Sequence, residues 1–153
     1  MDEKIETTAE YVEASAMKLG RAVHTGEGPC PGPEDAPLPE ALQKKPVDEK
    51  SPAEWAYERL ILYIKNFENI LDAEHEVGMG LTDTGAGVLR IEGLGYFDPD
   101  LVTFYGTDGM GARVQLVQHV TQLNVVLRAN PKANKEAPAR RIGFDLAKGL
   151  GEA

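Results

Sequence analysis

The stretch from His75 to Arg128 constrains the fold most, because short runs of β-forming residues alternate there with turns rich in glycine and aspartate. Runs of this length suit strands better than helices. We therefore expect five strands, over residues 76–81, 88–96, 101–105, 112–118 and 122–128. Glycines inside the first two strands mark places where a sheet bends at low cost. The stretch predicts a small, strongly bent antiparallel sheet or a barrel.

A helix is expected immediately before the strands, from Pro52 to about Leu71. Ser51 is a good N-cap, proline suits the first helical position, and Glu54 completes a capping-box pattern. The apolar residues of this helix cover a broad face: Trp55, Leu60, Ile61, Ile64, Phe67, Ile70 and Leu71. A face of this width has to be buried, so the helix must pack on the strands that follow it.

Residues 114–127 fit two secondary structures. Leu116, Val120, Leu123 and Leu127 recur at helical spacing. Five valines lie in the same stretch, however, and β-branched residues favour strands. We expect two strands here. The alternative is a second helix packed on an open sheet.

The flanking segments are expected to be simpler. Residues 1–23 form an acidic extension whose thin apolar stripe, between residues 4 and 20, indicates a marginal helix. Residues 24–52 hold seven of the ten prolines, so 24–51 is predicted to be a semi-extended linker without helix or strand. Residues 52–129 are the folded domain. Residues 130–153 are a basic tail with a short C-terminal helix. The predicted fold class is α+β.

The net charge of −9 limits the classes of partner. Residues 51–129 carry 5 basic and 11 acidic side chains, whereas residues 130–153 carry 5 basic and 3 acidic ones. A phosphate backbone requires clustered Lys and Arg, so RNA is disfavoured unless folding gathers a local basic patch. The sequence shows no apolar run of about 18 residues and no signal-peptide pattern. We therefore expect a cytoplasmic protein without a membrane partner.

Few residues suggest catalysis. His119 with Asp98 or Asp100 is the one candidate acid–base set. Turn formation around Pro99 is the simpler explanation for the two aspartates. Gln118 and Tyr105 are included as candidate binding residues. These residues define the candidate site.

No metal and no cofactor are predicted. His75 lies beside three carboxylates, but the spacing is not that of a zinc site, and His24 falls in the linker. The single cysteine, Cys30, excludes an intrachain disulfide. The glycine-rich stretches 85–87 and 106–111 lack the strand-to-helix setting and the Lys-Ser/Thr ending of a phosphate loop.

A helix followed by five short, bent strands resembles the layout of Sm-like barrels, the class that includes Hfq. Residues 94–98, Leu-Gly-Tyr-Phe-Asp, resemble the end of the second strand in the first Sm motif. Residues 118–120, Gln-His-Val, followed by two valines at 125–126, resemble the second motif. The resemblance covers roughly residues 52–128. It implies an Sm-like barrel with open edges that pair between subunits, and hence a homo-oligomer.

The RNA pocket of that class is not matched. Its stacking residue and its base-reading Asn follow the Phe-Asp pair, where this chain has Asp100 and Val102. The basic residue of the second motif is replaced by Gln118. The resemblance therefore implies the fold without the pocket.

A second resemblance covers the chain as a whole. The segments SPAEWAYERL (51–60) and QHVTQLN (118–124) resemble a family of small alphaproteobacterial proteins that has no assigned activity. It implies no catalytic residues. The sequence thus favours a non-enzymatic binding or assembly module that acts through protein–protein contacts. The alternatives are an Sm-like RNA-binding protein and a small enzyme that uses His119.

Overall fold

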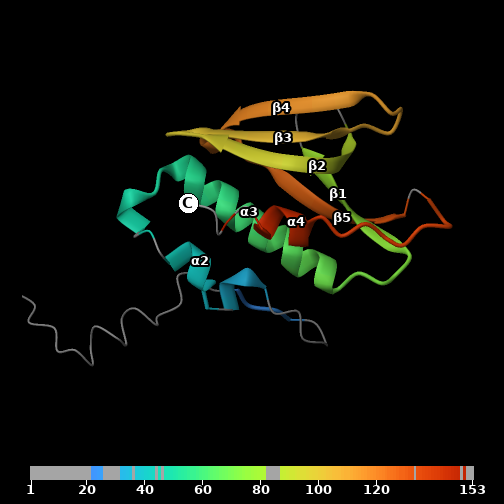
Figure 1. The fold of residues 1–153 in the computed structure, drawn as a ribbon, viewed down its shortest axis with the longest axis horizontal. Coiled ribbons are helices and arrows are strands. Elements are labelled where there is room, and N and C mark those ends of the chain that lie inside the picture. The colour runs from blue at the N-terminus through green and yellow to red at the C-terminus, as the bar shows by residue number, and fades with distance from the viewer. Residues whose placement is uncertain are drawn as a thin grey trace, which may run out of the picture. The chain divides into compact units, whose positions relative to one another are not determined.

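The fold is taken from a computed structural model that describes residues 22–25, 32–35, 37–43, 45, 47–81, 87–132, 134–148 and 150. The chain divides into two compact units, residues 1–39 and residues 40–153, and each is described by itself. The described part of the first unit includes one 3-10 turn, η1 (Pro33–Asp35). The second unit contains, in chain order, α2 (Glu40–Gln43), η2 (Val47–Glu49), α3 (Pro52–Asn69), β1 (His75–Leu81), β2 (Val88–Phe97), β3 (Leu101–Thr107), β4 (Arg113–His119), η3 (Val120–Gln122), β5 (Val125–Pro131) and α4 (Gly143–Lys148) (Figure 1).

The five strands form one antiparallel sheet in the order β4-β3-β2-β1-β5, so β4 and β5 are its two edges. β1 pairs with β5 along its whole length, but with β2 only next to Met79 and Gly80. β2 also carries a register shift between Ile91 and Gly93, and such a bulge bends a strand. The sheet is therefore strongly bent, with β1 and β5 turning away from β2, β3 and β4 (Figure 1). The predicted fold class is confirmed in its open-sheet form, because the edge strands do not close a barrel.

Helix α3 begins where the sequence predicted. The Ser51 Oγ accepts a hydrogen bond from the Glu54 N–H at 3.0 Å, and Pro52 is the first helical residue. The second half of the predicted capping box is wrong, because the Glu54 carboxylate accepts from Lys45 Nζ at 3.1 Å. A charged donor binds a carboxylate more strongly than a neutral N–H does.

The core lies between α3 and the inner face of the sheet, which is the face toward this helix. Ile64 of α3 packs there against fully buried side chains from three strands: Met79, Leu89, Ile91, Val102 and Phe104. Burying each such side chain contributes about 1.5–3 kcal/mol. This burial explains why the wide apolar face of the helix and the strands fold together.

A residue of the C-terminal segment bridges the strands where β1 and β2 diverge. The guanidinium of Arg140 donates to the carbonyl oxygen of Ile91 in β2. The backbone N–H of Arg140 donates to Glu76 Oε1 in β1 at 2.8 Å. Burial, reinforced by the neighbouring Arg90, lowers the pKa of Arg140. The segment before α4 therefore takes the place of missing ladder hydrogen bonds.

Two sequence-based expectations about secondary structure have clear outcomes. Residues 114–127 form β4, η3 and β5, so the helical alternative is wrong, because β4 continues the ladder of β3 from Arg113 to His119. The expectation that 24–51 holds no helix is wrong at α2, which lies in the proline-free stretch between Pro39 and Pro46. The marginal helix expected between residues 4 and 20 lies outside the described residues, as does Cys30. Among the described residues, no helix combines the length and the apolar character that crossing a bilayer requires.

Candidate functional site

The turn from Asp98 to Asp100 joins β2 to β3 and holds three elements together. Ser51 Oγ, at the start of α3, donates to Asp98 Oδ1 at 2.5 Å. The carbonyl oxygen of Pro99, which follows a cis peptide bond, accepts the Ala53 N–H at 3.0 Å. The carbonyl oxygen of Asp100 accepts the Val120 N–H at 2.8 Å. The predicted turn thus anchors both the helix and the β4–β5 connection.

His119 meets one of the two aspartates. Its Nε2 lies 3.1 Å from Asp100 Oδ2, and both side chains are about two-fifths exposed, at 42% and 43%. Its Nδ1 accepts the Thr121 N–H at 3.2 Å and lies 2.7 Å from Thr121 Oγ1. We assign the ring proton to Nε2 because Nδ1 acts as an acceptor. Both ring nitrogens are therefore occupied in capping η3 and in binding the turn.

Asp98 is not part of that pair, since its described hydrogen bond joins Ser51. Gln118 lies on the other face of β4 from His119, opposite Val102 in β3. It is buried, and among the described residues its Oε1 has no hydrogen-bond partner. The structure thus separates Gln118 and Asp98 from the His119–Asp100 pair.

Tyr105 lies on the outer face of the sheet, the face away from α3. It stands opposite Gly93, and its ring covers the bare backbone of β2. A Cβ built on Gly93 would lie 3.5 Å from Tyr105 Cδ2, and one on Gly95 would lie 3.7 Å from Cε2. The ring is 42% exposed. Tyr105 therefore forms a shallow aromatic platform that is separate from the Asp100–His119 pair.

Two tyrosines lie between α3 and β2 beside the same turn. The rings of Tyr57 and Tyr96 have centroids 5.0 Å apart and are tilted by 47°. Burial raises the pKa of both phenols, so both remain neutral well into the alkaline range. They extend the packing of the helix on the sheet and present no charge there.

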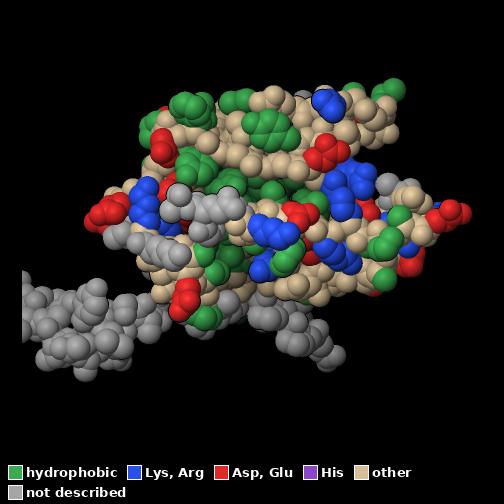
Figure 2. Space-filling view, viewed as in Figure 1, with side chains coloured by type: hydrophobic (Ala, Val, Ile, Leu, Met, Phe, Trp, Pro, Cys, Tyr) green, Lys and Arg blue, Asp and Glu red, His purple; other side chains and the backbone are tan. Residues whose placement is uncertain are grey.

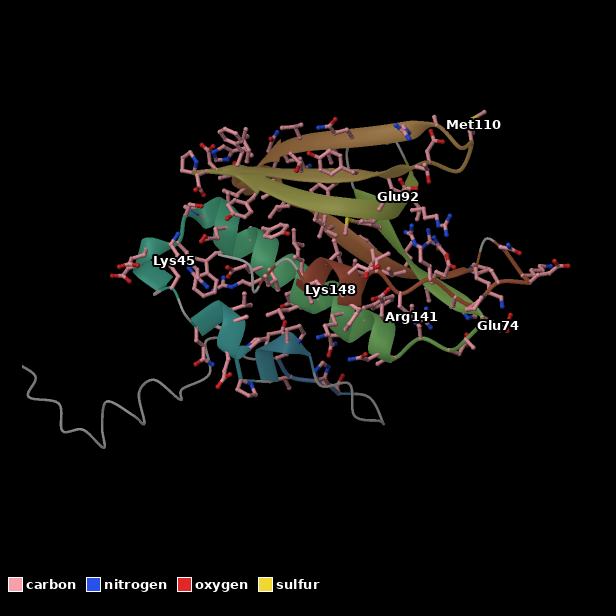
Figure 3. All side chains as sticks on the ribbon, viewed as in Figure 1. Lys45, Glu74, Glu92, Met110, Arg141 and Lys148 are labelled. Atoms are coloured by element: carbon pink, nitrogen blue, oxygen red, sulfur yellow. The ribbon has the colours of Figure 1, made fainter. Side chains whose placement is uncertain are left out.

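The residues considered for metal binding have other roles. His75 Nδ1 lies 2.6 Å from Asp72 Oδ1. Arg141, which is labelled in Figure 3, donates to the carbonyl oxygens of His75 and Asp72 at 2.7 and 2.8 Å. Within the described ranges no three His, Cys, Asp or Glu side chains gather closely enough to hold a metal ion. His24 is exposed in the first unit.

The second glycine-rich stretch is a hairpin loop. Asp108 Oδ1 accepts the N–H groups of Met110 and Ala112, each at 2.9 Å, and Met110 lies at the tip between β3 and β4 (Figure 3). Because the loop joins two strands, it does not lead into a helix, and it therefore lacks the helix N-terminus that a phosphate loop uses to bind phosphate. Most of 85–87 lies outside the described residues.

Sequence reasoning did not identify which strands form the two edges of the sheet. β4 and β5 each have one row of backbone N–H and C=O groups that pair with no strand of the described sheet. Val117 in β4 is 54% exposed and Val126 in β5 is 45% exposed. Figure 2 shows hydrophobic side chains along the upper rim, over β3 and β4. The valine-rich pattern pointed to strands, but only the strand order identifies the edges.

The profile of one protein family, described as a family of unknown function (DUF6173), matches residues 46–145. The match begins just before α3 and ends within α4, so it covers the sheet and both helices that pack together. No curated protein and no solved structure matches the chain.

Proposed function

The chain belongs to this family of unknown function, and we propose that it acts as a binding and assembly module whose contacts are made by the edge strands β4 and β5. One observation carries the proposal. Each edge strand is seven residues long, and its outward row of backbone groups pairs with no strand among the described residues. An unpaired edge is a template for a strand from another molecule.

The edges carry few of the features that usually prevent such pairing. β4 contains one arginine, Arg113, and no lysine or proline. β5 contains one arginine, Arg128, and its one proline is its last residue, Pro131. Each edge exposes a valine, Val117 and Val126. Backbone pairing joined to apolar contact is how sheets extend between chains. These properties support self-association, with other proteins as further partners.

The geometry of the edges limits the assemblies. If β4 of one copy pairs with β5 of the next, the contact is head-to-tail and gives a ring or a filament. If β4 pairs with β4, the contact is isologous and gives a dimer. The mass of the assembly in solution distinguishes the two arrangements.

Two substitutions test the proposal. Val117→Lys and Val126→Lys place a charge on an edge strand, where lysine disfavours strand addition. We expect each to lower the mass measured by size-exclusion chromatography with light scattering, with an unchanged circular dichroism spectrum. Met110→Lys is the matched control, because Met110 is 94% exposed at the hairpin tip. A wild-type protein that is monomeric at every concentration would remove self-assembly from the proposal.

The contacts give less support to the two alternatives, an Sm-like RNA-binding protein and a small enzyme that uses His119. Val102, at the position where the Sm motif reads a base, is fully buried in the core and has no access to a ligand. Asp100, at the stacking position, is paired with His119. An enzyme using His119 would first have to release a ring nitrogen from Asp100 or from Thr121. The edge strands therefore carry the proposal.

A further inference from the structure

Three arginines lie on the outer face of the sheet at neighbouring register positions. Arg90 of β2 is opposite Thr107 of β3, and Thr107 is opposite Arg113 of β4. Directly paired residues of neighbouring strands point to the same face. On the other side, Arg128 of β5 is opposite Gly78 of β1.

Gly78 and Arg90 are on this same outer face. A Cβ on Gly78 would meet Val88 and Asn130, and Arg90 Nε lies 3.8 Å from Glu76 Oε2 in β1. Neighbouring paired strands are separated by about 4.8 Å, so Arg113, two strands from Arg90 along the β2–β3–β4 ladder, is about 10 Å from it. Arg90, Arg113 and Arg128 are called the arginine row below.

The arginine row keeps most of its positive charge free. Arg113 and Arg128 are exposed, and within the described part of the chain neither forms a hydrogen bond or an ion pair through its side chain. Arg90 forms an ion pair with Glu76, which is nearly buried and also accepts the Arg140 N–H. The exposed Glu92 lies two residues further along β2 and is close enough to Arg140 to affect its pKa. β3 and β4 contribute no acidic residue to this face. Three arginines against Glu76 and Glu92 thus leave a local excess of positive charge on a chain whose net charge is −9.

An apolar area adjoins the arginine row on the same face. On this face Tyr105 is the next residue along β3 after Thr107, and its ring lies over Gly93 and Gly95 of β2. Val117 lies four residues after Arg113 along β4. The side chains are 42% and 54% exposed. Arginine and tyrosine are the residue types enriched at the energetic centres of protein interfaces.

We propose that the outer face of the sheet binds an acidic protein segment, whose carboxylates pair with the arginine row and whose apolar side chain packs on Tyr105 and Val117. The inference rests on the proposed binding function and names the chemistry of the partner. Arginine forms two parallel hydrogen bonds with a carboxylate, which suits each position of the row. A helix with glutamates two turns apart presents them about 10–11 Å from each other, close to the arginine spacing.

A protein segment fits this face better than a nucleic acid does. Three phosphate contacts release few counterions and give weak affinity. The remaining charge of the chain repels a long polyanion but only weakly opposes a short acidic segment, because salt screens charges beyond about 8–10 Å. The apolar neighbour of the row also suits a mixed acidic and apolar segment.

The test uses the full-length protein and three fluorescein-labelled probes. The first is a helical peptide with glutamates two turns apart and leucines beside them, the second is the same peptide with glutamine in place of glutamate, and the third is an oligouridine of similar length. Fluorescence anisotropy at low salt measures binding. We expect the glutamate peptide to bind at least about tenfold more tightly than the glutamine peptide, which corresponds to about 1.4 kcal/mol.

Arg113→Gln combined with Arg128→Gln should lower the affinity for the glutamate peptide by about tenfold or more. The control is Lys135→Gln combined with Lys148→Gln, which removes the same charge from exposed positions outside this face. Equal loss in both double variants, equal affinity for both peptides, or no binding would overturn the proposal. Arginine-dependent binding of the oligouridine alone would assign the face to nucleic acid instead.

The outcome is separable from that of the assembly proposal. Light scattering on the Arg113→Gln and Arg128→Gln double variant should give at least the wild-type mass, because the backbone edges are unchanged and removing a charge from an edge strand does not disfavour pairing. A monomeric wild-type protein that still binds the glutamate peptide would remove self-assembly and keep the acidic partner. An assembled protein that binds neither peptide would keep self-assembly and remove the acidic partner.

Discussion

The carboxylate of Glu68, near the end of α3, accepts the backbone N–H of Gly143, the first residue of α4, at 2.7 Å. The other oxygen of the same carboxylate accepts the Ile142 N–H at 2.8 Å. Glu68 is 6% exposed, so no bulk water replaces these bonds. One side chain thus satisfies backbone groups that the start of a helix leaves without partners.

Glu68→Ala should lower the free energy of unfolding by about 2–4 kcal/mol, because it leaves two buried N–H groups unpaired. Glu68→Gln keeps an acceptor oxygen and should cost less. Urea denaturation followed by circular dichroism measures both. A loss below about 0.5 kcal/mol for Glu68→Ala would mean that α4 does not depend on this cap.

Gly106→Ala should destabilise the sheet, because an added Cβ would overlap the carbonyl oxygen of Arg90 and lie 3.3 Å from Ile91 Cα. Both are backbone atoms at the bulge of β2, so they cannot move aside cheaply. We expect a loss above about 2 kcal/mol in thermal or urea unfolding. Gly109→Ala is the control, since a Cβ there meets nothing within 4 Å.

The buried pair Lys50–Glu58 should be costly to break. The two charged atoms are 2.8 Å apart, their side chains are 2% and 11% exposed, and Lys50 Nζ also lies 4.3 Å from the centre of the Trp55 ring. Lys50→Met leaves the Glu58 carboxylate buried without its cation, which typically costs about 3–5 kcal/mol. The double variant Lys50→Met with Glu58→Leu should be more stable than Lys50→Met alone. A double variant that is no more stable would show that the pair itself is not the cause.

The pH dependence of one surface carboxylate has a defined sign. The hydrogen bond with His75, aided by the Glu74 N–H, lowers the pKa of Asp72 below its ordinary value of 3.8. A carboxylate whose pKa is lowered by folding stabilises the folded state at pH values above its ordinary pKa. This contribution is lost as the pH falls through the lowered pKa. His75→Gln should therefore raise the pKa of Asp72 in a carbon-detected NMR titration. Lys148→Gln should leave it unchanged, and an equal shift in both variants would contradict the assignment.

A structural role for His119 predicts a graded response. His119→Ala removes the acceptor for the Thr121 N–H and should cost about 1 kcal/mol, whereas His119→Asn keeps a capping oxygen and should cost a few tenths. Thermal unfolding measures the difference. Equal losses for the two variants would indicate that the contact with Asp100, and not the cap, carries the stabilisation.

Local patterns were sufficient for the main elements. The Ser51-Pro52 start and the wide apolar face of α3 are readable because a helix is set by residues three or four apart. The strands were located for a similar reason, and the β-branched residues of 114–127 correctly favoured two strands. Of the two aspartates that the sequence offered to His119, the structure brings Asp100 to it, while the turn directs Asp98 toward Ser51.

The sequence by itself determined that one broad-faced helix packs on a bent sheet, since burying apolar surface leaves that helix no other large partner. Only the tertiary structure decided that β4 and β5 are the edges and that Arg90, Arg113 and Arg128 share a face. It alone also joined Glu68 to Gly143, 75 positions apart. These relationships depend on strand order, on register and on the return of the C-terminal segment to α3. All three are set by packing between distant segments, so no periodic pattern in the local sequence indicates them.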